Sequence, residues 1–245
     1  LGLSTIQIVT AKNQQFSAQT LARQNIVKLV NKIKEVVYLL ESAFKWIENI
    51  SSSALEVCDG MGSYKVFNKM TDCKITLEKF GEVELCNYIN LNESDKLQAL
   101  NMRNHIRIKK WMHNQGSISE EDHFGFIENL EIDTVRRYFL IKQKDNIIGS
   151  INFSKINFEN SLELGIYTNP FFQIKDAGRL LESAASQYAF IEIGVKKIKL
   201  EVYSDNERAV NFYKKCDFNL INTKKANHQN IMYMEKIKVL EGVSE

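Results

Sequence analysis

The sequence predicts an α+β protein built around a sheet with several antiparallel strands. Short runs rich in β-branched and aromatic residues follow one another with turn residues between them. Longer stretches carry apolar residues at helical spacing. The composition is 44% hydrophobic, 25% charged and 10% aromatic, which provides enough apolar side chains for a sizeable core in a chain of 245 residues.

In the first part of the chain, the sequence predicts a strand followed by helices. The apolar residues Ile6, Ile8 and Val9 indicate the strand. The sequence Asp59-Gly60-Met61-Gly62 interrupts the helical pattern, and no clear period follows as far as Phe80. We therefore expect a first block over residues 1–70 and a linker over residues 71–81. The helices are expected over residues 17–24, 31–49 and 51–57, and the second has an apolar face of Val36, Val37, Leu39, Leu40, Ala43, Phe44 and Ile47.

In the second part of the chain, the sequence predicts a succession of strands and helices. Ser119-Glu120-Glu121-Asp122 has the spacing of a capping box, so a helix is expected to begin there. Lys144-Asp145-Asn146 is typical of a hairpin turn, and Pro170 is expected to end a strand. The expected strands cover residues 83–89, 138–143, 147–156, 161–168, 198–203, 218–222 and 231–237, and the expected helices cover residues 94–102, 119–130, 178–193 and 207–215.

The charge balance argues against a protein whose main role is to bind nucleic acid. The chain has 32 Lys and Arg residues and 30 Asp and Glu residues, which gives a formal net charge of +2. Arg103, His105, Arg107, Lys109 and Lys110 form one local basic cluster. An RNA-binding module that uses this cluster with Trp111 stays a less favoured alternative.

The sequence shows no membrane span and no cysteine motif. Charged residues interrupt every long apolar stretch, including residues 26–50. The four cysteines lie far apart without a CxxC pair, so we expect no disulfide framework, no metal site and reduced thiols in a cytoplasm. The chain begins with Leu1 and lacks the features of a signal peptide, so we expect it to begin inside a longer protein.

Residues 173–181 follow a predicted strand and begin a predicted helix, which is a place where a pyrophosphate can bind. The unpaired backbone N–H groups of a first helical turn converge there, and the helix dipole favours negative charge. Ala177 and Gly178 are small enough for the backbone to approach a phosphate closely, while Lys175 and Arg179 add positive charge. An ordinary turn between a strand and a helix stays open as the alternative.

Two motifs then resemble the GCN5-related N-acetyltransferases, the GNAT family. Gln173 to Gly178 is similar to the Q/R-x-x-G-x-G/A pyrophosphate loop of that family. Asn206, Ala209, Tyr213 and Phe218 match the spacing of its N-x-x-A-x-x-x-Y-x-x-x-x-F element. The resemblance implies a mixed, mostly antiparallel central sheet flanked by helices, an N-acetyltransferase activity and acetyl-CoA as co-substrate. It covers residues 82–239, which leaves residues 240–245 as a tail.

One subgroup of the family is especially similar, namely the UDP-4-amino-4,6-dideoxy-N-acetyl-β-L-altrosamine N-acetyltransferases of bacterial pseudaminic acid synthesis. This resemblance implies a UDP-linked amino-deoxy sugar as acceptor, and it leaves a homodimer possible. Ribosomal-protein N-terminal acetyltransferases share the early Arg-Asn element and are the nearest alternative. The matching residues are Met102-Arg103-Asn104-His105, Phe126 to Leu130, Tyr138 to Ile141, Ile148 to Phe153 and Leu162 to Tyr167.

The chain departs from the family pattern at two glycine positions. Asp176 stands where the first glycine of the pyrophosphate loop is usual. A carboxylate about 5 Å from a phosphate would cost roughly 3 kcal/mol at an effective dielectric constant near 20, unless Asp176 turns outward or caps the helix. Asp217 replaces the glycine that commonly precedes Phe218, which we interpret as a variation in the turn.

The first block resembles the C-terminal tail of the UDP-sugar hydrolase that acts one step earlier in the same pathway. Gly2-Leu3, Ala11 to Gln14 and Asp59 to Val66 carry this resemblance. It implies that residues 1–70 are an α/β remnant of a GT-B-like domain, in which Asn13 and Gln14 match nucleotide-sugar contacts. A fragment of a bifunctional hydrolase and acetyltransferase, or a helical extension with accidental matches, are the alternatives.

Two residues are expected to carry the proton transfers of acetyl transfer. Alternation along residues 161–168 places Glu163, Gly165 and Tyr167 on one face of a strand, where Glu163 could take the amine proton. Tyr213 could protonate the thiolate, because an unperturbed tyrosine with a pKa of about 10 is a proton donor at neutral pH. A solvated surface role for Glu163 and a core-packing role for Tyr213 stay open.

The remaining candidates would bind the two substrates. Backbone N–H groups of Gly165 and Ile166 would orient the thioester carbonyl, and Asn206 would either bond the pantetheine arm or cap a helix. Arg103, Asn104, His105 and His123 are candidates for the acceptor, with a solvated surface as the alternative. The full set for acetyl-CoA is Gly165, Ile166, Tyr167, Gln173, Lys175, Asp176, Ala177, Gly178, Arg179, Asn206, Ala209 and Tyr213.

Overall fold

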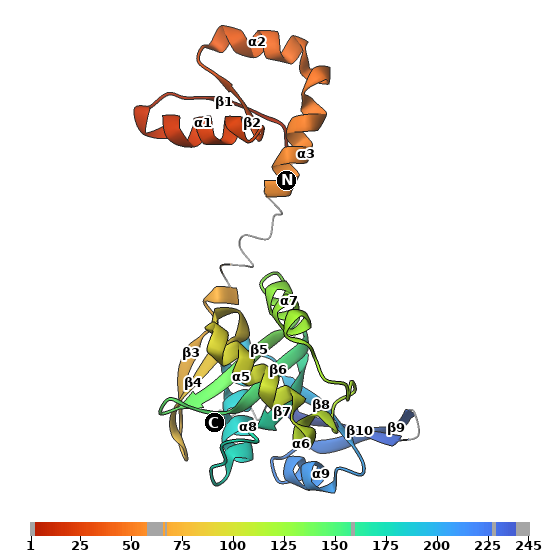
Figure 1. Ribbon diagram of the computed structural model, residues 1–245. Helices are drawn as coiled ribbons and strands as arrows, with labels where there is room; N and C mark the ends of the chain where they lie inside the picture. The colour runs from red at the N-terminus through yellow and green to blue at the C-terminus, as the bar shows by residue number, and fades with distance from the viewer. Residues whose placement is uncertain (1–2, 58–65, 67, 158–159, 227–228, 239–245) are drawn as a thin grey trace, which may run out of the picture. The chain divides into compact units, whose positions relative to one another are not determined.

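The structure is a computed structural model that describes residues 3–57, 66, 68–157, 160–226 and 229–238. The chain divides into two compact units, Leu1–Val66 and Phe67–Glu245 (Figure 1). Among the residues that the structure describes, each unit has its own sheet, with two strands in the first unit and eight in the second. We describe the two units separately.

The first unit begins with a parallel pair of strands. β1 (Thr5–Ile8) pairs with β2 (Val27–Val30), and the connection contains η1 (Lys12–Gln14) and α1 (Gln15–Arg23). The predicted strand and first helix are confirmed, whereas β2 was not predicted because Val27-Lys28-Leu29-Val30 is too short to show a period. Asn13 and Gln14 are exposed in η1.

The prediction of one helix over residues 31–49 is wrong, because the segment folds into three elements. They are α2 (Ile33–Glu41), η2 (Ala43–Lys45) and α3 (Ile47–Val57), and α3 takes in the helix predicted over 51–57. Trp46 explains the break: its indole is buried, and Nε1 donates to the carbonyl oxygen of Leu39 at 3.0 Å. The expected apolar face of α2 is largely exposed, since none of its residues is buried.

The second unit contains an eight-stranded sheet in the order β3-β4-β5-β6-β7-β8-β10-β9. Neighbouring strands are antiparallel, except for the parallel pair β7 and β8. The predicted α+β class and mostly antiparallel sheet are therefore confirmed. The strands are β3 (Cys73–Leu77), β4 (Gly81–Asn87), β5 (Arg137–Gln143), β6 (Asn146–Asn157), β7 (Ser161–Thr168), β8 (Lys197–Tyr203), β9 (Asn219–Ala226) and β10 (Gln229–Ile237).

The expected linker over residues 71–81 is wrong, because most of it belongs to this sheet. β3 pairs with β4 through a tight turn in which Gly81 has a φ of 74°, and Ile75 and Leu77 are buried. Asn68 and Thr71 are also buried parts of the second unit. The first block therefore ends near Val66 rather than at residue 70.

Helices cover both faces of the sheet. One buried cluster joins α8 (Ala177–Gln187) to strands β3 to β8 and to α9 (Glu207–Lys214). A second cluster joins η3 (Tyr88–Asn90), α5 (Glu93–Asn104) and α7 (Glu120–Leu130) to the sheet through Leu140 and Ile147. The remaining helices are the four-residue α6 (Ile106–Lys109) and η4 (Tyr188–Ile193), a π-helical turn that continues α8.

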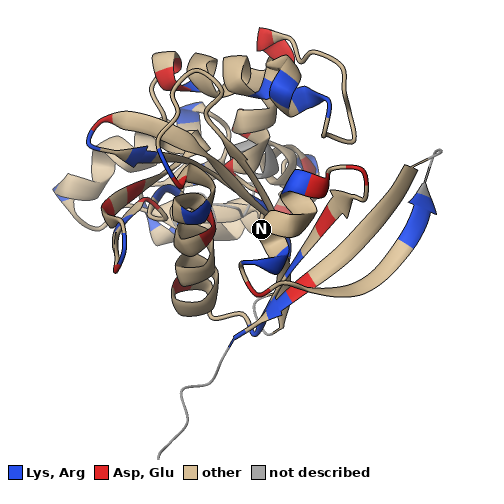
Figure 2. Cartoon of the chain, turned by 90° about the horizontal axis from the view of Figure 1, so that it is seen from below, with Lys and Arg blue, Asp and Glu red and all other residues tan. Residues whose placement is uncertain are grey.

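Local signals in the sequence set several of these boundaries. The Ser119 hydroxyl accepts a hydrogen bond from the backbone N–H of Asp122 and caps α7, as the capping box predicts. Lys144 and Asp145 both have positive φ in the hairpin turn between β5 and β6, which is typical of a two-residue turn of this kind. Figure 2 shows a separate feature, the distribution of charge: segments with Lys or Arg (blue) and segments with Asp or Glu (red) are interspersed over the elements in view.

The parallel strands β7 and β8 part after a short common stretch. Their ladder joins Ser161–Glu163 to Lys197–Lys199, although β7 continues to Thr168 and β8 to Tyr203. The gap between the two strands therefore lies within the sheet, beyond Glu163 on β7 and Lys199 on β8. None of the helices in the described ranges has both the length and the apolar character that crossing a bilayer requires.

Candidate active site

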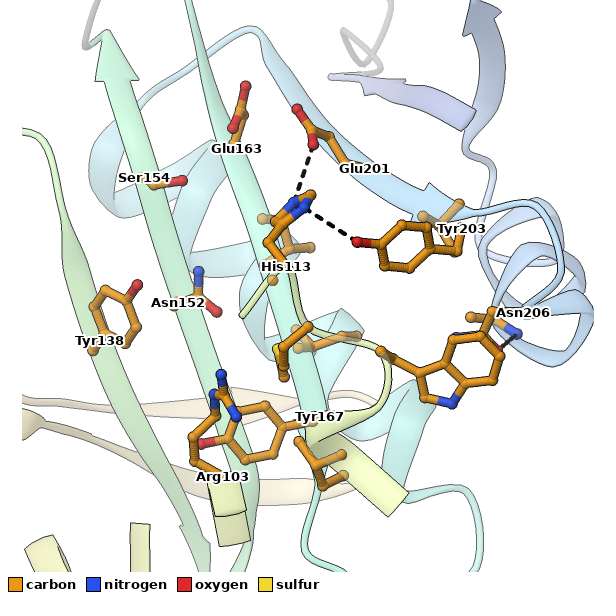
Figure 3. Close-up of a pocket in the computed structure, with 18 of the residues that line it drawn as sticks. Arg103, His113, Tyr138, Asn152, Ser154, Glu163, Tyr167, Glu201, Tyr203 and Asn206 are labelled. Carbon is orange, nitrogen blue, oxygen red and sulfur yellow. Dashed lines mark hydrogen bonds and ion pairs between the residues drawn. The ribbon is translucent and has the colours of Figure 1, made fainter. Parts of the chain in front are cut away.

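A cavity of about 670 Å³ lies where β7 and β8 part. One wall is the end of β7 from Glu163 to Tyr167, and the opposite wall is the end of β8 from Glu201 to Tyr203. Residues from α5 and from the segment between α6 and α7 close a third side, as Figure 3 shows. Polar side chains therefore converge on a gap in the sheet.

Glu163 projects from β7 into this cavity, as the alternation of the strand predicts (Figure 3). Its carboxylate oxygen Oε1 lies 2.8 Å from Nζ of Lys155, which stands on the neighbouring strand β6. The side chain is about a quarter exposed, at 26%. The hydrogen bond to Glu163 raises the pKa of Lys155. The carboxylate is thus partnered but still reachable from the cavity.

A second carboxylate, which the sequence analysis did not single out, faces Glu163 from β8. The Oε2 atom of Glu201 lies 3.3 Å from Nε2 of His113. The Nδ1 atom of His113 lies 3.4 Å from the hydroxyl of Tyr203, also on β8. Alternation along residues 198–203 places Glu201 and Tyr203 on one face of their strand, so the same rule that indicated Glu163 could have found them.

Tyr213 reaches the cavity from α9 and is also part of the core. Its ring packs against Phe212 and Phe218, with centroids 5.3 Å and 5.5 Å away. Burial raises the pKa of Tyr213, with smaller contributions from Cys216 and Glu182. The phenol therefore stays protonated well above neutral pH, so the catalytic and the packing interpretations of Tyr213 are compatible.

Asn206 and Ala209 lie at the start of α9 and line the same cavity. The Oδ1 atom of Asn206 accepts a hydrogen bond from the backbone N–H of Ala209 at 3.3 Å, so the helix-cap role is present. Gly165 and Ile166 line the cavity from β7. A Cβ atom on Gly165 would collide with the amide group of Asn152 on β6, so a larger residue there would have to displace the Asn152 side chain.

The predicted pyrophosphate loop lies beside this cavity rather than in its lining. Gln173, Lys175, Asp176 and Arg179 are exposed around the N-terminus of α8. Gly178 has a further role, because a Cβ atom there would lie 3.3 Å from the ring of Phe212. Its small size allows close packing of α8 against α9.

Asp176 and Asp217, the two departures from the family pattern, share one backbone feature. Their φ angles are 60° and 65°, both in the left-handed region where glycine is favoured. Aspartate is among the residues that tolerate this region best. The side chain of Asp176 makes no cap hydrogen bond to α8, so the expectation that it caps the helix is not met.

Arg103 and His123, two of the four acceptor candidates, line the cavity. Nη2 of Arg103 donates to the carbonyl oxygen of Asn114 at 2.6 Å. Among the described residues, Nη1 of Arg103 is a buried atom without a hydrogen-bond partner. His123 lies 3.0 Å from the carbonyl oxygen of Lys96 through Nε2, and burial lowers its pKa.

Arg103 adjoins a group of buried phenols that also line the cavity. The Tyr88 hydroxyl lies 2.8 Å from Oγ of Ser150 and 3.3 Å from the hydroxyl of Tyr167. Burial raises the pKa of Tyr88, Tyr138 and Tyr167, so these groups stay neutral hydrogen-bonding side chains. This end of the cavity offers donors to an oxygen-rich ligand.

Asn104 and His105 are engaged in contacts outside the cavity lining. The amide of Asn104 exchanges two hydrogen bonds with the backbone of Ile118, at 2.8 Å and 2.9 Å. His105 caps α6 by accepting from the N–H of Arg107 and packs against Phe171. Their sequence-based assignment to the acceptor stays a prediction, and the structure gives both a structural task.

The site can therefore support acyl transfer between two substrates that meet at the parting of β7 and β8. Carboxylates face the gap from both strands, and a neutral phenol reaches it from α9. The N-terminus of α8, flanked by the exposed side chains of Lys175 and Arg179, suits an anionic group. Within the described ranges, no group of three or more His, Cys, Asp or Glu side chains is arranged to hold a metal ion.

Comparisons with known proteins identify the family. The model of the acetyltransferase (GNAT) family matches residues 101–218. The acetyltransferase PseH of Campylobacter jejuni is 33% identical over 138 residues, which are 56% of this chain and 85% of that protein. The crystal structure of C. jejuni N-acetyltransferase PseH in complex with acetyl coenzyme A covers 64% of this chain and 99% of that chain, with a TM-score of 0.53 and 25% identity.

A second group of relatives consists of spermidine N-acetyltransferases from Vibrio cholerae. One is 33% identical over 88 residues, which are 35% of this chain and 51% of that protein. A structure with CoA and spermine has a TM-score of 0.55 and 24% identity over 63% of this chain and 95% of that one, which shows a shared fold alone. The chain therefore belongs to the GNAT family and is an N-acetyltransferase that uses acetyl-CoA.

Proposed function

We propose that the chain acetylates the 4-amino group of a UDP-linked amino-deoxy sugar in pseudaminic acid biosynthesis. Its similarity to PseH supports this choice within the family. The observation that carries the proposal is the buried, unpartnered Nη1 of Arg103 at the phenol-lined end of the cavity. A buried donor needs an acceptor atom, and a sugar or phosphate oxygen would supply one.

A polyamine is the competing acceptor, because the spermidine N-acetyltransferases are also relatives. Glu163 and Glu201 could attract a polycation, but each already contacts a basic side chain, Lys155 and His113 respectively. Arg103 and Arg107 also line the cavity. This charge balance favours an acceptor with oxygen atoms or phosphates over an acceptor with several ammonium groups.

The mechanism follows from the positions of the side chains. Glu163 takes the proton of the acceptor amine, directly or through water, so that the nitrogen can attack the thioester carbonyl carbon. Backbone N–H groups of Gly165 and Ile166 stabilise the developing oxyanion. As the carbon–sulfur bond breaks, Tyr213 returns a proton to the thiolate. Acetyl-CoA supplies the activated acetyl group, while Asn206 and residues 173–179 hold its pantetheine and pyrophosphate parts.

Mass spectrometry of reactions that contain acetyl-CoA and one candidate acceptor at a time tests the identity of the acceptor. The candidates are a UDP-4-amino-4,6-dideoxy sugar, spermidine and a peptide with the N-terminus of a ribosomal protein. We expect a mass increase of one acetyl group on the nucleotide sugar at an enzyme concentration that leaves the other two unchanged. Acetylation of spermidine or of the peptide, with the sugar unmodified, would overturn the proposal.

For the first unit we propose a remnant of a UDP-sugar hydrolase that has no activity of its own. Asn13 and Gln14, the candidate nucleotide-sugar contacts, are exposed in η1. We expect no release of UDP from a diacetylated UDP-sugar, and release at a rate comparable to acetyl transfer would show instead that the chain is bifunctional.

A further inference from the structure

Residues 110–119, which we call the strap, join α6 to α7 and bound the active site on its acceptor side. Trp111, Met112, His113 and Ile118 of the strap line the cavity. The strap is anchored to the helices beside it: Arg103 donates to the carbonyl of Asn114, and Lys109 contacts Ser117 at 3.1 Å. Asn104 pairs with the backbone of Ile118. These bonds tie the strap to the α5–α6 side of the cavity.

His113 makes the contact that spans the cavity to β8. Nε2 lies 3.3 Å from Oε2 of Glu201, and Nδ1 lies 3.4 Å from the Tyr203 hydroxyl. The imidazole also packs edge-on against the ring of Tyr203, with centroids 5.9 Å apart. Residues 110–119 all lie in a described range, and among their hydrogen bonds and ion pairs those of His113 reach β8.

The two ring nitrogens suit their partners chemically. A neutral imidazole with its proton on Nε2 donates to the Glu201 carboxylate and accepts from the Tyr203 hydroxyl at Nδ1. The protonated ring would keep the bond to Glu201 as an ion pair. The His113 side chain is nevertheless 70% exposed, so the contact is placed where solvent or a ligand can displace it.

We propose that His113 is a positioning residue that holds the strap closed against β8 and so shapes the acceptor half of the active site. This inference rests on the proposed acceptor only for its kinetic consequence. The strap anchors on its own side persist without His113, so the strap would loosen rather than unfold. Acceptor binding would then weaken, whereas acetyl-CoA, expected at α8 and α9, would bind as before.

Tryptophan fluorescence tests the structural part of the proposal without any substrate. The chain has two tryptophans, Trp46 in the first unit and Trp111 in the strap. A Trp46→Phe background therefore leaves Trp111 as the reporter, and acrylamide quenching measures its accessibility. A Trp111→Phe protein supplies the Trp46 signal for subtraction if the first unit tolerates Trp46→Phe poorly.

In that background we compare His113→Ala, His113→Gln and Gln115→Ala. The Gln115 side chain is exposed on the same strap and serves as the control. We expect His113→Ala to raise the quenching constant by about twofold and Gln115→Ala to leave it unchanged, since exposed contacts of this kind are modest in strength. His113→Gln should restore part of the protection, because its amide can both donate and accept. Unchanged quenching in His113→Ala would overturn the proposal.

The kinetic arm uses the UDP-4-amino-4,6-dideoxy sugar as acceptor. We expect His113→Ala to raise its KM about three- to tenfold while the KM for acetyl-CoA and kcat change less than about twofold, as the loss of one exposed contact predicts. A fall in kcat with an unchanged acceptor KM would instead make His113 part of the chemistry and contradict a positioning role. If wild-type protein does not acetylate this sugar, the proposed function fails, while the quenching result still decides the inference.

Discussion

Helices α2 and α8 have similar amphipathic patterns and opposite surroundings. None of the nine residues of α2 is buried. In α8, seven of eleven residues are buried, including Leu180, Leu181 and Ala184. The difference lies in the sheet of each unit: α8 packs on an eight-stranded sheet, whereas the described part of the unit that contains α2 has a parallel pair of strands. An apolar pattern thus predicts which face of a helix can be buried. Whether that face is buried depends on the strands and helices that the rest of the unit supplies.

The two units also differ in their candidate functional residues. The residues around the cavity come from strands β5 to β8 and β10, from η3 and helices α5, α6, α7 and α9, and from the strap between α6 and α7. In the first unit the sequence singled out Asn13 and Gln14, which are exposed on one short helical turn. In the large sheet of the second unit, the gap between β7 and β8 brings together side chains from distant parts of the sequence. We therefore expect acetyl transfer to depend on the second unit.

The largest expected effect concerns Glu163. We predict that Glu163→Gln lowers kcat about 10²- to 10⁴-fold at neutral pH, because a general base contributes on this order. The loss should shrink as pH rises, since more of the acceptor amine is then already neutral. Steady-state rates across the pH range with saturating acetyl-CoA measure this, and acetyl-CoA binding should be nearly unchanged.

Two further variants sharpen the assignment. Glu201→Gln tests whether the carboxylate on β8 takes the proton instead, in which case it, and not Glu163→Gln, would show the large loss. Tyr213→Phe should fall further behind wild type at high pH, where solvent supplies few protons to the thiolate. The raised pKa of Tyr213 keeps the phenol protonated under these conditions. Wild-type kcat in both Glu163→Gln and Tyr213→Phe would exclude these side chains as the proton carriers.

The second effect tests the comparison of the two helices directly with one substitution in each. Leu180 of α8 is fully buried, whereas Leu40 of α2 is 60% exposed. We predict that Leu180→Ala destabilises its unit by about 2–5 kcal/mol, because it removes buried apolar surface and leaves a cavity. Leu40→Ala should change the stability of its own unit by less than about 0.5 kcal/mol.

The two tryptophans allow each unit to be followed by itself during urea unfolding. Trp46 reports on the first unit and Trp111 on the second, so Trp111→Phe and Trp46→Phe backgrounds separate the transitions. A loss of more than about 2 kcal/mol in Leu40→Ala would mean that α2 is covered in solution, and the contrast between the helices would fail.

The third effect concerns truncation of the chain near the boundary between the two units. A chain that begins at residue 67 should keep wild-type kcat and KM, because the described lining of the cavity belongs to the second unit. A chain that begins at Asp72 should be less stable by about 2 kcal/mol. It loses buried Asn68, whose Nδ2 lies 3.0–3.3 Å from the carbonyl oxygens of Leu130, Glu131 and Asp133.

Asn68→Ala in the full-length chain is the matched control for this truncation. It should reproduce most of the loss in stability, because it leaves the same carbonyl groups at the end of α7 without the amide. Equal stability of the two truncated chains would place the boundary at residue 70 or later, as the sequence alone suggested.

How far the sequence could be interpreted depended on whether a signal was local. The cap at Ser119, the turn at Lys144-Asp145 and the alternation of β7 are short-range features, and the structure confirms each of them. β3 was missed because Cys73–Leu77 is short and acquires its meaning only by pairing with β4. Likewise, the contact of His113 with Glu201 joins residues 88 positions apart, which no spacing rule detects.

The smallest effect separates two aspartates that share one conformation. Asp176 and Asp217 both have left-handed φ angles, so replacing either by glycine relieves backbone strain while adding flexibility to the unfolded chain. We predict that Asp176→Gly and Asp217→Gly each change the stability of the second unit by less than about 1 kcal/mol.

Acetyl-CoA binding should distinguish the two variants. Asp176 is exposed at the N-terminus of α8, where its negative charge would oppose the proposed pyrophosphate, whereas Asp217 lies in the turn after α9. Because solvent screens an exposed charge, we expect Asp176→Gly to tighten acetyl-CoA binding by about three- to tenfold rather than more. Asp217→Gly should leave binding unchanged. Thermal shift at a series of acetyl-CoA concentrations measures both, since a ligand that binds the native state raises the melting temperature with its affinity. If the two variants respond equally to acetyl-CoA, the charge of Asp176 does not face the phosphates, and the departure from glycine in this loop affects the backbone alone.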